Sequence, residues 1–145
     1  MSAPLYNADL LRLAATMPYA TRLAEPGGSA EKRSPICGSR VTVDVRLDQA
    51  GRVAELGQLV RACALGQASA AVMGAAAIGK DAGELAAARD TLAAFLKGHR
   101  DDAGDWPGIG VLAAARDYPA RHASIRLAFE AVAEAAANAA RRDAA

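Results

Sequence analysis

The chain has 145 residues with 17 basic and 16 acidic side chains, and it is 52% hydrophobic but only 4% aromatic. These values exclude a disordered chain and predict a single globular domain over residues 1–145, with a core of alanine, valine and leucine. A net charge of +1, with no basic patch interleaved with aromatic residues, predicts neither a nucleic acid nor an anionic membrane as partner.

The N-terminal residues start without basic side chains and include an early acid, unlike a signal peptide. The longest uncharged run, residues 62–79, is mostly alanine, glycine and serine and is too weakly apolar to favour lipid. We therefore expect a cytoplasmic protein with no membrane span. In that compartment two cysteines are more often reactive or metal-binding than joined in a structural disulfide.

The first elements are short. Residues 4–16 predict a helix with Asn7 as its N-terminal cap and a leucine and alanine stripe. Residues 24–35 are rich in proline and glycine and contain the charged sequence Glu-Lys-Arg at 31–33. This composition predicts a loop with a short edge strand at 30–34.

A strand pair follows. Residues 41–47 alternate between aliphatic side chains on one side and Thr42, Asp44 and Arg46 on the other, which predicts a half-buried strand. Residues 53–60 predict a second, less regular strand with Gly57 as a candidate bulge. The turn at 48–51 joins the two into an antiparallel hairpin.

Helical patterns take over in the second half of the chain. Residues 65–78 predict a buried helix of small residues, and residues 82–97 predict a second helix. After a polar connection and a short apolar turn at 109–115, a last helix begins at Pro119, and its tail beyond about residue 138 is expected to fray. The order predicts an α+β fold, a small antiparallel sheet of about three strands with helices packed on one face.

The turn also predicts where the two cysteines meet. If Leu47 pairs with Arg52, Cys37 lies opposite Ala62, next to Cys63, and a bulge in the second strand would shift this pairing by one residue. Opposite residues on such a ladder have Cβ atoms about 5 Å apart. We therefore expect both thiols at the open end of the hairpin.

The surroundings of the cysteines favour a thiolate. Cys63 immediately precedes a helix, whose unpaired amides stabilise negative charge. Gly38 leaves room for a partner beside Cys37, and Ser39 faces the same way as Cys37 in an extended chain. Two cysteines can equally be small core residues or a reversible disulfide, so the spacing alone leaves these alternatives open beside a metal or sulfur site.

Three segments resemble consecutive blocks of the NifU/IscU/SufU-type iron–sulfur cluster assembly scaffolds, nearest the SufU branch. They are ICGSRVTVDVRLDQAGRVAE, VRACALGQASAAVM and YPARHASIRLAFEAV. The resemblance spans about residues 5–135 and implies the family's fold, a SufE/NifU-like α+β domain. It also implies a metal site built from a cysteine–glycine–aspartate motif, a second cysteine before a helix and a third cysteine on the last helix, preceded by a histidine in the IscU branch.

Only part of that ligand set carries over. Cys37 and Cys63 match the first two cysteines, whereas Ser39 stands at the aspartate and Ser124 at the third cysteine. His122 matches the histidine only after a one-residue shift, and packing on the helix is its plainer interpretation. Because a neutral hydroxyl is a poor ligand for iron, zinc or a cluster, we expect weak and transient binding.

The resemblance implies a non-enzymatic scaffold that binds iron, zinc or a nascent iron–sulfur cluster, and sulfur, through two cysteines. Its implied partners are a cysteine desulfurase and acceptor apoproteins, with a homodimer around a shared cluster as one arrangement. Two alternatives remain open. One is a metal-free relative that docks on the desulfurase and modulates it, and the other is a relay that carries sulfur as a persulfide.

Overall fold

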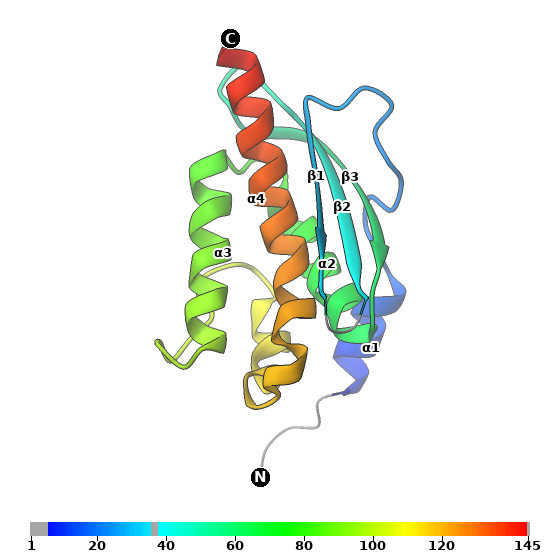
Figure 1. The fold of residues 1–145 in the computed structure, drawn as a ribbon, viewed down its shortest axis with the longest axis vertical. Helices are drawn as coiled ribbons and strands as arrows, with labels where there is room; N and C mark the ends of the chain where they lie inside the picture. Colours follow the sequence, from blue (N-terminus) through cyan, green and yellow to red (C-terminus); the bar gives the residue numbers. More distant parts are fainter. Residues whose placement is uncertain (1–5, 36–37, 145) are drawn as a thin grey trace.

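The computed structural model describes residues 6–35 and 38–144 and has the α+β architecture that the sequence predicts (Figure 1). Its three strands form an antiparallel sheet in the order β1-β2-β3. The strands are β1 (Gly28–Arg33), β2 (Arg40–Leu47) and β3 (Val53–Arg61). The helices are α1 (Ala8–Ala15), α2 (Ala64–Ala77), α3 (Ala82–Leu96) and α4 (His122–Ala144), with 3₁₀ turns η1 (Ile109–Asp117) and η2 (Pro119–Arg121) before α4.

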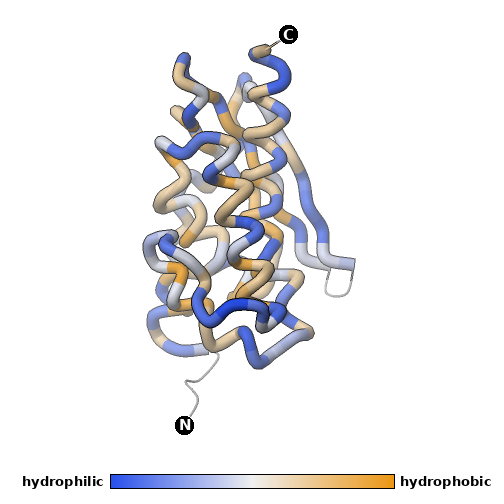
Figure 2. The backbone as a smooth tube through the Cα atoms, turned by 90° about the vertical axis from the view of Figure 1, so that its left-hand side faces the viewer, coloured by the Kyte–Doolittle hydropathy of each residue, from blue (hydrophilic) through white to orange (hydrophobic). Residues whose placement is uncertain are grey.

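The helices lie in layers on one face of the sheet. α4 packs across β1 and β2, and α3 covers the side of α4 that is turned away from the sheet (Figure 1). The inward side chains of β2, Val41, Val43 and Val45, are fully buried against this layer. Viewed from the α3 side, hydrophobic and hydrophilic segments alternate along the helices, as expected for helices with one buried side (Figure 2).

α2 is the small-residue helix that the sequence predicts, and ten of its residues are buried. Its glycines allow close contact, because a Cβ atom at Gly74 would lie 2.9 Å from the Pro18 side chain and 3.0 Å from that of Gln58. Its N-terminal half also meets α4, where the Ser69 hydroxyl donates to the Ile125 carbonyl. Within the described part of the chain no helix combines the length and hydropathy needed to cross a bilayer.

The outer face of β2 is not exposed as the alternating pattern predicts. Asp44 is completely buried, because the segment after α1 crosses over this face of the sheet. Asp44 accepts two hydrogen bonds from the Arg22 guanidinium at 2.8 and 2.9 Å, and one from the Leu23 amide at 3.1 Å. The Ser29 hydroxyl donates a fourth at 2.6 Å, so the buried carboxylate ties the crossing segment to β1 and β2.

The hairpin register differs from the predicted one. Leu47 pairs with Val53 rather than Arg52, and a bulge leaves Ala54 as the extra residue between the partners of Arg46 and Leu47. Gly57 pairs regularly with Asp44, so the predicted bulge at this position is wrong. Glycine is needed there because a Cβ atom would lie 2.4 Å from the Thr21 carbonyl of the crossing segment.

The first and last helices lie near the two ends of the chain. The expected helix at 4–16 is seen as α1, and residues 4 and 5 lie outside the described residues. α4 runs to Ala144, and the fraying expected beyond residue 138 stays a prediction. Tertiary contacts hold this end: Ala139 is fully buried and the Asn138 amide donates to the Ser29 carbonyl at 3.0 Å.

Candidate metal and sulfur site

Three chain segments meet at one end of the hairpin. The β2–β3 ladder ends at the pair Arg40–Arg61, with Ser39 directly before it and Cys63 two residues after it. The first turn of α4 brings Ser124 to the same place, since its hydroxyl contacts that of Ser39. Strand pairing and helix packing therefore place three of the predicted site residues together.

Cys63 is the N-cap residue of α2 and is half-buried. Its backbone is extended (φ −65°, ψ 172°), and its side chain makes no capping hydrogen bond. The first turn of α2 contains no acidic residue. The unpaired amides of that turn therefore lie next to Cys63, with no neighbouring carboxylate in the turn.

Ser39 and Ser124 form a buried hydroxyl pair. Their Oγ atoms lie 3.4 Å apart, and the two residues are only 4% and 1% exposed. Gly66, in the first turn of α2, lies beside this pair, and a Cβ atom there would be in ordinary contact with Ser124, at 3.4 Å from its carbonyl. Glycine is needed because the same Cβ atom would lie only 2.6 Å from the Cβ atom of Ala62, and sequence reasoning did not single out this position.

A tight loop leads into Ser39. The Ser34 amide donates to the Ser39 carbonyl at 2.9 Å, and the Gly38 amide donates to the Ser34 carbonyl at 3.1 Å. Gly38 has a positive φ of 72°, which suits glycine. The buried Ser34, which closes the loop, was not among the predicted site residues. Cys37 lies outside the described residues, so its approach to Cys63 stays a prediction.

His122 takes a different position at the start of α4. Its Nε2 atom lies 3.1 Å from the Ala115 carbonyl and 2.9 Å from the Arg116 carbonyl, so this nitrogen donates to the end of η1. Residues two apart on a helix do not share a face, so His122 and Ser124 point in different directions. The prediction that His122 is a ligand stays a prediction, and it requires the Nδ1 atom.

The donor set is unusual for a metal site. Among the described residues, a set that omits Cys37, no three histidine, cysteine, aspartate or glutamate side chains cluster to hold a metal ion. Arg40, which directly follows Ser39, is already paired with a carboxylate, since its guanidinium lies 3.7 Å from that of Glu31. A neutral hydroxyl, as at Ser39 and Ser124, is a poor ligand for iron or zinc.

Comparisons with known proteins place the chain in a family. Residues 18–125 match the model of the NifU-like N terminal domain. A NifU-like protein (N-terminal) from Brucella abortus is similar in structure, with 39% identity and a TM-score of 0.87 over 94% of this chain and 95% of that one. No curated protein matches the chain.

Two more distant structures share the fold. A putative iron–sulfur cluster assembly scaffold protein for the SUF system from Fervidobacterium islandicum has 20% identity and a TM-score of 0.81, over 91% of this chain and 96% of that one. A hypothetical protein has 21% identity and a TM-score of 0.71, over 90% and 95%. The domain match over residues 18–125 and the 39% identity with the Brucella abortus protein show that the chain belongs to the NifU-like N-terminal domain family.

Proposed function

We propose that the protein is a non-enzymatic scaffold of iron–sulfur cluster assembly, which holds iron, zinc or a nascent cluster, and sulfur, as transient cargo. The observation that carries this proposal is the meeting of Ser39, Cys63 and Ser124 at the end of the hairpin, in a chain of the NifU-like family. The resemblance assigns four of the family's ligand positions to residues 37, 39, 63 and 124 of this chain, and two of these residues are cysteines.

Cys37 and Cys63 are the proposed thiolate ligands. If the hairpin register carried on beyond the Arg40–Arg61 pair, residue 63 would be level with residue 38, which is adjacent to Cys37 in the chain, and this supports the proposal. Ser39 and Ser124 supply hydroxyl oxygens beside them, and His122 is a further proposed ligand through Nδ1. Thiolates are the soft ligands that iron–sulfur clusters and zinc prefer, and hydroxyls add little affinity.

The proposed mechanism is ligand exchange. A cysteine desulfurase transfers sulfane sulfur to a thiolate as a persulfide, and an added dithiol reductant reduces that sulfur to sulfide and is itself oxidised to a disulfide. Ferrous iron and the sulfide then form the unit on the thiolates, and the unit passes to an acceptor apoprotein that offers stronger ligands. Transfer requires a donor site that binds less tightly than the acceptor, which a site of two thiolates and two hydroxyls satisfies. Because a [2Fe–2S] unit takes four protein ligands, two copies of this chain sharing one unit supply four thiolates.

Anaerobic reconstitution with ferrous iron, cysteine, a dithiol reductant and a cysteine desulfurase tests the proposal. Cluster formation should give visible charge-transfer absorption, and Cys37→Ala and Cys63→Ala should each remove it. Lys97→Met, an exposed change at the end of α3, is the control and should behave as the unchanged protein. Size-exclusion chromatography of the loaded protein should show a dimer if the cluster is shared.

Two other outcomes identify the alternatives. A mass increment of sulfur on a cysteine without bound iron would indicate a persulfide relay, which the helix N-terminus at Cys63 also favours. Unchanged desulfurase binding by both alanine variants, with no metal in the purified protein, would indicate a docking protein that has lost the cargo. Either result would replace the scaffold proposal.

A further inference from the structure

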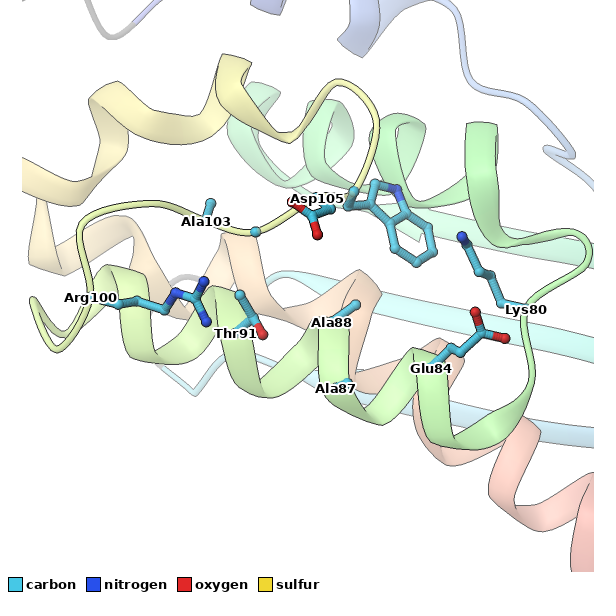
Figure 3. A pocket seen from close by; sticks show the side chains of 10 residues that line it. Lys80, Glu84, Ala87, Ala88, Thr91, Arg100, Ala103 and Asp105 are labelled. Carbon is cyan, nitrogen blue, oxygen red and sulfur yellow. The ribbon is translucent and has the colours of Figure 1, made fainter.

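A cavity of about 400 Å³ lies between α3 and the segment that connects α3 to η1 (Figure 3). This size falls in the range of small-molecule sites, roughly 300–1,000 Å³. One wall is a face of α3, formed by Glu84, Ala87, Ala88 and Thr91. The other wall is the connecting segment, with Arg100 and residues 103–106.

The walls of the cavity are fixed by specific contacts. The Trp106 indole donates from Nε1 to the Val72 carbonyl at 2.8 Å and packs edge-to-face on Phe129, with ring centroids 5.2 Å apart. Gly104 has a φ of 98°, and a Cβ atom there would lie 2.7 Å from the Thr91 methyl group. The connecting segment therefore approaches α3 as closely as glycine allows, which keeps the cavity preformed.

Lys80 is the charged group that this cavity leaves without a counterion. It is half-buried, its Nζ atom lies 5.6 Å from the centre of the Trp106 ring, and it makes no ion pair with any described residue. Figure 3 shows Lys80 entering at one end and Arg100 pointing in from the other. A half-buried ammonium without a carboxylate partner favours an anion beside it.

The other charged side chains around the cavity are paired elsewhere or exposed, so none of them neutralises the Lys80 ammonium. The Glu84 carboxylate lies 2.8 Å from the Arg52 guanidinium and also accepts from the Asp81 amide. Arg100 is paired with the Asp102 carboxylate at 3.0 Å. Asp105 is exposed to solvent, where screening weakens its repulsion of an anion. The buried part of the lining is apolar: the indole lies beside Lys80, and Ala103 lies towards the Arg100 end (Figure 3).

We propose that this cavity binds a small carboxylate with an apolar body. The Lys80 ammonium holds the carboxylate, and the body lies over Ala88, Ala103 and the indole. Because Trp106 is the only tryptophan in the chain, its emission reports directly on this cavity. The site lies outside the cysteine region and does not depend on the proposed cargo function.

Hexanoate is the probe, with hexanol and hexylammonium as matched compounds of the same chain length. Hexanoate should shift Trp106 emission in a saturable way and give a matching dissociation constant by calorimetry, whereas the other two should bind about tenfold more weakly or not at all. Lys80→Met keeps the stem over the indole and should weaken hexanoate binding about tenfold. Ala88→Leu should block the cavity with the charge intact.

Lys97→Met is the matched control and should bind hexanoate unchanged, as should Cys37→Ala and Cys63→Ala. Far-ultraviolet circular dichroism checks that each variant folds. The proposal is overturned if hexanoate gives no saturable change, if hexylammonium binds as well as hexanoate, or if Lys80→Met binds as the unchanged protein does. Loss of cluster formation with intact hexanoate binding would affect only the scaffold proposal.

Discussion

The Ser39 hydroxyl lies 3.4 Å from the Ser124 hydroxyl, across 85 residues of sequence, and both residues are buried. The contact joins the start of β2 to the first turn of α4, beside the half-buried thiol at the start of α2. By resemblance, these positions carry an aspartate and a cysteine in related scaffolds. In the proposed site, the pair would therefore offer two neutral groups, in contact with each other, where the resemblance implies two anionic ligands.

Restoring a thiol at position 124 should increase metal retention. Ser124→Cys adds a third soft ligand beside Cys63 and the loop of Cys37, so zinc affinity should rise by about tenfold or more. Competition with a chromophoric chelator measures it. Ala137→Cys, on an outer part of the same helix, is the control for a new thiol and should leave affinity unchanged. Equal affinity of both variants would contradict the proposed site.

A carboxylate at position 39 should make folding depend on metal. Ser39→Asp places an ionised group in a buried position with no cation, which should lower the free energy of unfolding by about 2–3 kcal/mol without metal. Zinc should restore most of the loss. Ser39→Asn, of similar shape and neutral, should show no zinc-dependent recovery in urea denaturation. Recovery of both variants, or of neither, would show that position 39 does not face the cargo.

His122 can be tested as a structural donor against a ligand. Gln also donates to the Ala115 and Arg116 carbonyls, so His122→Gln should keep the free energy of unfolding within about 0.5 kcal/mol, whereas His122→Ala should lose about 1 kcal/mol. Metal affinity should be unchanged in both if His122 serves only as a donor to η1 through Nε2. A fall in affinity for His122→Gln at unchanged stability would instead identify Nδ1 as a ligand. His99→Ala is the exposed control.

The buried carboxylate of Asp44 should dominate the acid sensitivity of the fold. Burial raises its pKa, but the hydrogen bonds from Arg22, Ser29 and the Leu23 amide lower it by more, so the pKa lies below the ordinary value of 3.8. Asp44→Asn should cost about 2–3 kcal/mol at pH 7. Asp9→Asn, which removes an exposed ion pair, should cost less than about 1 kcal/mol.

The sign of the pH effect follows from the lowered pKa. The stabilisation by Asp44 is complete above the unfolded-state pKa near 3.8 and is lost as pH falls through the lower folded-state value. Urea denaturation at pH 7 and at pH 3 should show a smaller decrease for Asp44→Asn than for the unchanged protein. The same decrease in both would show that other carboxylates control acid unfolding.

Gly57 should tolerate no side chain. A Cβ atom there would lie 2.4 Å from the Thr21 carbonyl and 3.0 Å from the Leu23 amide, both backbone atoms. Gly57→Ala should therefore lower the free energy of unfolding by about 2 kcal/mol or more. Gly110→Ala, in η1 with nothing within 4 Å of the added atom, is the control and should change stability little. Thermal denaturation of the two variants measures the difference.

Much of the architecture follows from local sequence patterns. The alternation over residues 41–47 predicts β2, and the small residues after Cys63 predict α2, because strand and helix periodicities depend on neighbours a few residues apart. The position of Cys63 directly before that helix is readable in the same way. The register of the hairpin is not, since the extra residue Ala54 replaces the bulge expected at Gly57.

The sequence by itself determined the elements, their order and the placing of a cysteine at a helix start. Tertiary structure alone decided that Asp44 is buried, that Asn138 near the end of α4 donates to Ser29, and that Ser39 contacts Ser124. Each of these features arises because a segment that is distant in the sequence packs on the residue concerned. The local sequence pattern around that residue does not predict this packing. Such contacts arise only when the whole core packs, so no short window of residues specifies them.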